Sequence, residues 1–198
     1  MRYISIDLET TGLNSENCQI LSFGAVIEDT RKKLPFSEIP KFYAIIVREQ
    51  IIGEPFALNM NRDLIALIAE YFNGDKEKRQ ALQEVEGLFL REEHLVGHFL
   101  KFLQDNGFDN SEFIKITVAG KNFATFDLKF LVKVPRWKHY FRVNQRILDP
   151  AILFVDWEND EELPNLLKCK QRAGIAGAIS HNSLEDAWDV ILTLRAKY

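Results

Sequence analysis

The sequence contains few cysteines and no long apolar run, and both shortages narrow the class of protein. Only two cysteines occur among 198 residues, Cys18 and Cys169, and they lack the spacing of metal ligands. We therefore expect reduced thiols and no disulfide framework. No apolar stretch approaches the length of a membrane span, and the first expected strand follows Met1 too closely to leave room for a signal peptide. These features predict a cytoplasmic protein with no membrane partner.

The chain also lacks an excess of basic residues. Its formal net charge is -4 at pH 7, which argues against a protein that coats nucleic acid through bulk electrostatics. Residues 129–146 are the exception, because basic side chains are interleaved there with aromatic rings and no acidic residue occurs. This segment is either a single-strand binding surface or a helix–loop–helix whose rings are core and whose charges are solvated. The cations are Lys129, Lys133, Arg136, Lys138, Arg142 and Arg146, and the rings are Phe130, Trp137, Tyr140 and Phe141.

Length and patterning indicate one α/β domain over residues 1–198. The chain is 46% hydrophobic and 12% aromatic, which provides a substantial core, and no linker or repeat divides it. Apolar alternation predicts strands over 2–8, 19–28, 41–47, 113–119 and 146–149. Helical spacing predicts helices over 62–72, 75–90, 93–105, 124–133, 163–172 and 183–197. The first three expected strands follow one another directly, and helices separate the later strands, which indicates a mixed sheet.

Two acidic side chains stand at the end of the first expected strand. The run RYISIDLE alternates as a strand does, so Asp7 and Glu9, two residues apart, point to the same face. A turn predicted at 10–12 places them where open α/β sheets bind ligands. Neighbouring carboxylates resist ionisation unless a divalent cation neutralises them, so the pair predicts a metal site. A solvent-facing acidic strand end is the alternative.

Two later segments add candidates of the same kind. Asp127 lies at an expected strand-to-helix junction, where it and Asn122 are ambiguous alone, because acidic residues are common in the first turn of a helix. Ser183 and Asp186 resemble a capping box that opens the last helix. This would put His181 in the preceding loop and Asp186 in the first turn, facing one cleft. Beside metal ligands, an imidazole is suited to take a proton from water near neutral pH.

Four carboxylates and one imidazole are the side chains that a two-metal phosphodiester hydrolase requires. Their order, Asp-x-Glu, then Asn-x-x-x-Phe-Asp, then His-x4-Asp, resembles the DEDDh superfamily of 3′-to-5′ exonucleases. The resemblance rests on IDLETTGL at 6–13, NFATFD at 122–127 and HNSLEDA at 181–187. It is supported by ILDP at 147–150 and LPNLLKCKQRAGI at 163–175, and it leaves roughly residues 30 to 112 without a counterpart.

The resemblance implies a ribonuclease H-like fold, with a mixed five-stranded sheet flanked by helices, and two divalent cofactor ions, Mg²⁺ or Mn²⁺. By matching positions, Asp7, Glu9 and Asp186 would hold one ion, and Asp7 would also bridge to the second. Asp127 would support the site directly or through water. His181 would take the proton from the attacking water.

Thr10, Leu13, Asn122 and Phe126 are the positions expected to contact the terminal nucleotide. A helical insertion around 51–92 would either shape substrate access or be structural. The expected activity is removal of nucleoside 5′-monophosphates from the 3′ end of single-stranded RNA or DNA. The choice between RNA and DNA, and whether the chain forms a homodimer, stay open.

Two other readings of the same residues remain. One is a ribonuclease H-like nucleic-acid-binding or scaffold module that has lost activity. The other is a haloacid-dehalogenase-type phosphatase, whose motif is also acid-x-acid-x-Thr after an apolar strand. That family has Asp where this chain has Glu9, and it would leave His181 and Asp186 without a role.

Overall fold

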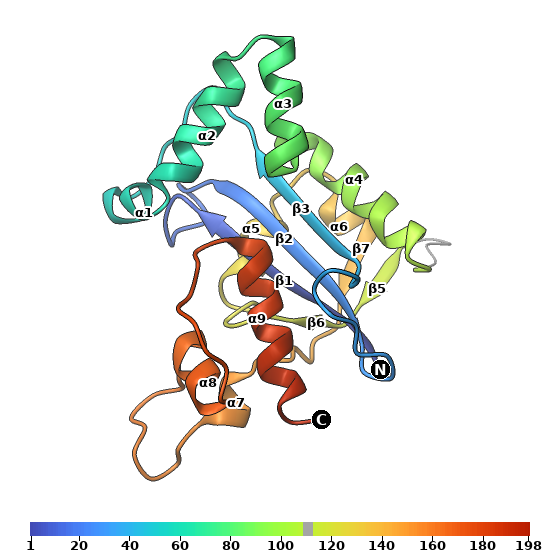
Figure 1. The fold of residues 1–198 in the computed structure, drawn as a ribbon, viewed down its shortest axis with the longest axis vertical. Coiled ribbons are helices and arrows are strands. Elements are labelled where there is room, and N and C mark those ends of the chain that lie inside the picture. The colour runs from blue at the N-terminus through green and yellow to red at the C-terminus, as the bar shows by residue number, and fades with distance from the viewer. Residues whose placement is uncertain (109–112) are drawn as a thin grey trace.

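A mixed five-stranded sheet forms the centre of the computed structural model, which describes residues 1–108 and 113–198 (Figure 1). The strand order is β4-β3-β2-β1-β6. β1 pairs antiparallel with β2, and β2 with β3, while β4 and β6 pair in parallel with β3 and β1. The strands are β1 (Arg2–Thr10), β2 (Ile20–Asp29), β3 (Lys41–Ile46), β4 (Leu88–Leu90) and β6 (Val118–Ala119). This confirms the expected α/β fold with a five-stranded mixed sheet.

Helices cover both faces of the sheet, and a short second sheet lies beside it (Figure 1). The second sheet pairs β5 (Ile114–Ile116) in parallel with β7 (Phe141–Val143). None of the helices in the described part of the chain combines the length and apolarity needed to span a membrane. The helices are α1 (Pro55–Met60), α2 (Arg62–Asn73), α3 (Lys76–Glu86), α4 (Glu92–Asp105), α5 (Asp127–Leu131), α6 (Trp137–Tyr140), α7 (Ala151–Phe154), α8 (Leu166–Arg172) and α9 (Ser183–Arg195).

The alternation of β1 decides which face carries the acidic pair. Ile4, Ile6 and Leu8 join the core formed with α4, α5 and α6. Tyr3, on the opposite face, packs with the apolar side of α9. Because side chains two apart on a strand share a face, Asp7 and Glu9 lie on the face that α9 covers. α2 packs on that face as well, farther along the sheet, through Ile68 against Leu21 and Ile45.

Three expected elements differ from the structure. The helix predicted over 75–90 ends at Glu86, because Gly87 adopts φ +107°, and the next residues form β4, in which Phe89 stacks on Tyr71 at 4.2 Å. The strand predicted over 113–119 divides, because β5 pairs with β7 whereas β6 pairs with β1. The strand predicted over 146–149 is reduced to one bridge from Leu148 to Ala119. In each case a pairing distant in sequence overrides the local pattern.

The aromatic rings of residues 129–146 belong mainly to the core. Phe130, Trp137 and Phe141 are 4%, 1% and 3% exposed. The alternative that made these rings core residues is therefore right, and the alternative that made them stack on nucleic-acid bases is wrong. The expected helix–loop–helix is shorter than predicted, with α5 and α6 followed at once by strand β7. Both cysteines are free thiols, with Cys18 half-buried and Cys169 buried, as expected.

The N-terminus of α9 lies directly on β2. Gly24, which pairs with Asp7 across the β1–β2 ladder, lets the helix backbone approach so closely that a Cβ there would lie 2.3 Å from the Ser183 carbonyl. The buried hydroxyls of Ser22 and Ser183 are hydrogen-bonded at 2.8 Å. The predicted capping box is therefore wrong, because the Ser183 side chain is used by the sheet. Asn182 caps the helix instead, accepting from the N–H groups of Leu184 and Glu185.

We expect Gly24→Ala to destabilise the protein by about 1–3 kcal/mol, because the added methyl group meets helix backbone that cannot yield as a side chain can. Gly97→Ala in α4 is the matched control: no heavy atom of the described residues lies within 4 Å of the new Cβ. Its greater helix propensity should stabilise the protein by about 0.5–1 kcal/mol. Urea unfolding midpoints of the two variants test this, and equal midpoints would contradict the close approach at Gly24.

Candidate active site

β1 delivers two carboxylates to one end of the sheet. Asp7 is half-buried and Glu9 is 6% exposed. The β1–β2 register shifts between Glu9 and Thr10, which is the irregularity of a β-bulge, and bulges redirect the strand and its side chains next to functional sites. The acidic pair therefore sits where β1 stops following the sheet.

A hydrogen bond from the backbone of β1 holds the Asp127 side chain against that strand. Its Oδ1 accepts the Leu8 N–H at 3.1 Å, and the side chain is 2% exposed. The last pair of the parallel β1–β6 ladder is Ser5 with Ala119, so Leu8 lies beyond the reach of β6 and its amide needs another acceptor. Asp127, the first residue of α5, supplies that acceptor and thereby lies between the positions of Asp7 and Glu9 on the strand.

α9 and the loop before it bring the remaining two residues. Asp186 lies in the first turn of α9, is 5% exposed, and accepts a hydrogen bond from the Ser180 hydroxyl at 3.2 Å. His181 is exposed, and a ring nitrogen of His181 and carboxylate oxygens of Glu9 and Asp186 all lie within 4.8 Å of one another. These three side chains could share one metal ion. Asp7 and Asp127 adjoin this group, because Asp7 shares the face of β1 with Glu9 and Asp127 accepts the N–H of Leu8, which lies between them.

Two of the expected site residues have left-handed backbone conformations. His181 has φ +53° and Asn122 has φ +59°. Asn accepts this conformation readily, but for a bulky residue such as His it costs roughly 1–2 kcal/mol. Such strain persists where the surrounding structure imposes it, and it is concentrated at functional sites. The strained backbone therefore distinguishes His181 from an ordinary solvated loop histidine.

Burial raises the pKa of every carboxyl group in the site, and repulsion from other carboxylates adds to the rise. Burial, followed by the charges of Asp127, Asp186 and Glu9, raises the pKa of Asp7 well above its usual range. Burial also raises the pKa values of Glu9, Asp127 and Asp186 to about 7, about 8 and about 6. Repulsion from Asp186 adds to the rise in the pKa of Glu9, and the neighbouring Asn61 amide opposes it. The hydrogen bond from Ser180 opposes the rise in the pKa of Asp186.

The donor set fits divalent cations. Among the described residues, no ion pair of a Lys, Arg or His with Asp7, Glu9, Asp127 or Asp186 is formed, so no protein cation neutralises the four carboxylates. Carboxylate oxygens are the ligands that Mg²⁺ and Mn²⁺ prefer. A bound cation would reverse the repulsion that raises these pKa values.

The four residues expected to contact substrate have different environments. Leu13 is 77% exposed and Asn122 is exposed. Thr10 is buried and its hydroxyl donates to the Gly12 carbonyl at 2.8 Å, so the side chain stabilises the turn. Phe126 is half-buried against Phe130.

Residues in the segment 51–61 reach the site although sequence patterns did not identify them. Asn61 is 4% exposed and its amide donates to the Thr10 carbonyl at 3.2 Å, while the Glu54 N–H donates to the Thr11 carbonyl at 2.7 Å. These bonds fix α1 beside the turn that follows β1. α1 carries Phe56, which is 80% exposed, and Met60, which is 40% exposed, next to the segment of Leu13. These residues reach the site only because α1 contacts the end of β1, and no local sequence pattern predicts that contact.

A buried lysine fixes the loop that carries His181. Lys170 of α8 is 3% exposed, donates to the Ala178 carbonyl at 3.0 Å, and forms an ion pair with Asp189, one turn along α9 from Asp186. The loop is therefore tied to α8 and α9 just ahead of Ser180 and His181.

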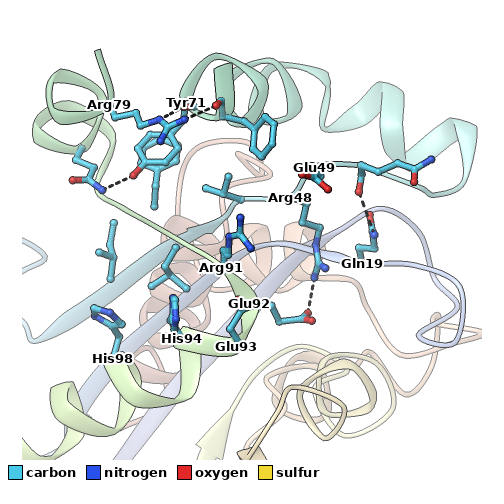
Figure 2. A pocket seen from close by; sticks show the side chains of 17 residues that line it. Gln19, Arg48, Glu49, Tyr71, Arg79, Arg91, Glu92, Glu93, His94 and His98 are labelled. Carbon is cyan, nitrogen blue, oxygen red and sulfur yellow. Dashed lines mark hydrogen bonds and ion pairs between the residues drawn. The ribbon is translucent and has the colours of Figure 1, made fainter. Parts of the chain in front are cut away.

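A separate pocket of about 770 Å³ lies at the edge of the sheet, between α2, α3, the ends of β3 and β4, and the start of α4 (Figure 2). Arg48 points toward Glu92 there and pairs with it at 2.6 Å, and Arg79 bonds to the end of α2. The arginines and glutamates that line this pocket are equal in number, so the charge of the lining favours neither an anionic nor a cationic ligand. They are Arg48, Arg79, Arg91, Glu49, Glu92 and Glu93.

No known protein family matches the sequence, and no curated protein matches it. Solved structures do share its fold. The structure of cell-death related nuclease 4 (CRN-4) has a TM-score of 0.58 at 11% identity, covering 98% of this chain and 62% of that one. The zinc-bound form of the E. coli ExoI–ssDNA complex has a TM-score of 0.60 at 14% identity, covering 98% of this chain and 40% of ExoI. The chain thus spans less than two thirds of either neighbour, and what it shares with them is a ribonuclease H-like fold.

Without divalent ions, we expect the protein to lose stability as the pH rises from about 4 to about 8. Unfolded carboxyl groups ionise near 3.8 to 4.5, whereas Asp186, Glu9 and Asp127 ionise near 6, 7 and 8 in the folded state. The folded state then binds more protons than the unfolded state, so stability is full below the unfolded values and is lost as the pH passes the folded ones.

Thermal melts in EDTA across this pH range test the expectation. Asp127→Asn should flatten the decline, and Mg²⁺ or Mn²⁺ should restore stability in the wild type. Asp63→Asn, which changes a 94% exposed side chain on α2, is the control and should leave the slope unchanged. A metal-free melting temperature that rises across the range would show that the carboxyl groups do not repel one another.

Proposed function

We propose that this protein is a divalent-metal-dependent exonuclease that removes nucleoside 5′-monophosphates from the 3′ end of single-stranded nucleic acid. The observation that carries the proposal is the convergence of Asp7, Glu9, Asp127, His181 and Asp186 at one end of β1. These residues come from three separate segments of the chain. The shared fold of a nuclease and of ExoI, whose structure contains single-stranded DNA, supports the same activity.

The carboxylates of Asp7, Glu9, Asp127 and Asp186 would hold the ions. Mg²⁺ or Mn²⁺ in this position would stabilise the charge that develops on the scissile phosphate and lower the pKa of a water molecule. The chain orients the carboxylates beforehand, because the Leu8 amide fixes Asp127 and the Ser180 hydroxyl fixes Asp186. The N-terminus of α9 also favours negative charge at Asp186.

His181 would act as the general base. The oxygen of a water molecule attacks the phosphorus of the last phosphodiester, and His181 accepts the proton that this water loses. The bond from phosphorus to the 3′ oxygen of the preceding nucleotide breaks, and that oxygen takes a proton from solvent. The products are a nucleoside 5′-monophosphate and a strand one nucleotide shorter with a free 3′ hydroxyl.

The terminal nucleotide would lie between the loop that carries Asn122 and the exposed apolar side chains of Leu13, Phe56 and Met60. Exposed apolar residues and rings suit contact with base faces. In this arrangement, the helical insertion around 51–92 shapes one wall of the site through α1, which Asn61 and Glu54 attach to the end of β1.

Digestion of end-labelled single strands and duplexes of RNA and DNA, with Mg²⁺ or Mn²⁺, tests the proposal. A ladder that shortens from the 3′ end one nucleotide at a time, with mononucleotide release, is the expected result. Cleavage within the strand, or phosphate release from small phosphomonoesters, would overturn it. Strand binding without hydrolysis under every metal condition would indicate a binding module.

We expect Asp7→Asn and Asp186→Asn to abolish hydrolysis, because each substitution removes a charged metal ligand. The fold should persist, because the site carboxylates repel one another in the absence of cations and losing one charge relieves that repulsion. Melting temperatures in EDTA should stay equal to the wild type or rise. Asp105→Asn, on the exposed side of α4, is the control for loss of one acidic charge. Near-normal turnover by either site variant would make the metal-ligand assignment wrong.

His181→Ala should lower turnover roughly 10²- to 10⁴-fold and leave metal affinity nearly unchanged, because the general base is removed and the carboxylates remain. His181→Asn separates chemistry from backbone geometry, since Asn tolerates the left-handed conformation and cannot act as the base. His94→Ala, an exposed histidine of α4, is the control. Calorimetric titration supplies the decisive comparison: a loss of metal affinity as large as that of Asp186→Asn would make His181 a ligand.

A further inference from the structure

A second candidate site lies at the β5–β7 sheet, away from the carboxylates. A hollow of about 730 Å³ opens there between β5 and the segment that follows β7. Its described lining includes Lys115 and Arg146, with polar groups from Thr117, Asn144 and Gln145 between them. None of the described residues that line this hollow is acidic.

The cations of this region continue along the sheet beside the hollow. Lys115 pairs in register with Arg142 across the parallel β5–β7 ladder, and both side chains are exposed while their strand neighbours are mostly buried. Like charges placed directly opposite each other destabilise a sheet. Arg142 also lies over the exposed ring of Phe113, 5.0 Å from its centroid. We call Lys115, Arg142 and Arg146 the β5–β7 cationic surface.

None of these three cations forms an ion pair with an acidic residue in the part of the chain that the structure describes. Arg31, Lys101 and Lys133, by contrast, pair with Asp29, Asp105 and Glu16. A surface that places cations side by side, with no acidic partner among the residues described, is complementary to a ligand with repeated negative charges.

The backbone holds this surface in place. The Asn144 N–H donates to the Ile116 carbonyl at 2.9 Å, and its side-chain amide donates to the Thr117 hydroxyl at 2.7 Å. The Leu148 N–H then donates to the Val118 carbonyl at 2.9 Å. Arg146 lies between these fixed points, so its backbone is positioned before any ligand arrives.

The surface lies on the same edge of the main sheet as the loop that carries Asn122 and Asp127. β6, the edge strand, pairs its Val118 with Ile4, which is five residues before Glu9, or roughly 17 Å along β1 at about 3.3 Å per residue. Figure 1 shows β5 and β7 at the end of the molecule opposite α1. A strand whose 3′ end enters the carboxylate site must therefore extend several nucleotides to reach the cations.

We propose that the β5–β7 cationic surface binds the phosphates of the substrate strand on the 5′ side of the nucleotide that is removed. This inference rests on the proposed function, because it concerns the same strand. The carboxylate end of the protein repels phosphates, so affinity for a long strand needs cations elsewhere. Lys115, Arg142 and Arg146 contact successive phosphates, and Phe113 offers a ring for a base.

Binding of a labelled single strand of about 20 nucleotides in EDTA, followed by fluorescence anisotropy, tests the surface without hydrolysis. The double variant Lys115→Gln, Arg146→Gln should weaken binding roughly tenfold at low salt and reduce the slope of log affinity against log salt by about 1.4, or about 0.7 for each phosphate that is no longer neutralised. Lys76→Gln with Lys78→Gln, on exposed positions of α3, removes equal charge and should change neither. Unchanged binding, or an equal loss in the control, would overturn the inference.

Two further arms identify the ligand. With Mg²⁺ or Mn²⁺ present, the Lys115 and Arg146 double variant should raise KM for the long strand, keep kcat, and leave hydrolysis of a dinucleotide unchanged, since a dinucleotide is too short to reach the surface. Competition by inorganic phosphate as effective as by a strand of equal phosphate concentration would show a small-anion site and overturn the strand assignment. Absence of hydrolysis by the wild type would refute the proposed function, while the binding comparison in EDTA would still decide this inference.

Discussion

The site depends on one close contact, the backbone of the first turn of α9 lying on Gly24 of β2. Gly24 pairs with Asp7, so this contact sets the distance between the strand that carries Asp7 and the helix that carries Asp186. The Ser22–Ser183 hydrogen bond keeps the helix from rotating about its axis. Any larger residue at position 24 would lift the helix and separate the carboxylates that are proposed to share cations. A residue without catalytic groups thus controls the geometry of the site.

The packing around this contact offsets the free-energy cost of forming the site. Four carboxylates that repel one another and a left-handed His181 both cost free energy. α9 compensates by burying Ala187, Val190, Ile191 and Leu194 against the sheet. At its far end, Arg195 donates to the fully buried Glu28 at 2.8 Å. The helix is therefore held at both ends and along its apolar face, so the repulsion at its first turn does not displace it.

Sequence patterns predicted the parts of the structure that depend on local periodicity. Strand alternation placed Asp7 and Glu9 on one face. The capping-box pattern placed Asp186 in a first turn, which is where it lies, although Asn182 and not Ser183 caps the helix. The patterns failed where a partner distant in sequence decides the structure. Residues 88–90 form a strand because they pair with β3, and the Ser183 hydroxyl bonds to Ser22 while Asn182 caps the helix. The role of Asn61 could not be predicted, since only its contact with Thr10 brings it to the site. The candidate residues were found, but the interactions that hold them together were not.

A negative net charge is compatible with the proposed nucleic-acid substrate, because the structure distributes the charges unevenly. The four carboxylates of the site carry formal charges equal to the whole net charge of -4, so the rest of the chain is formally neutral. Two divalent ions would cancel that excess. What then governs approach of a polyanion is the distribution of charge, with carboxylates gathered at the end of β1 and cations gathered at β5 and β7. In the binding mode proposed above, a strand held by its phosphates at the cations would present only its end to the carboxylates, which is the geometry that cleavage from a terminus requires.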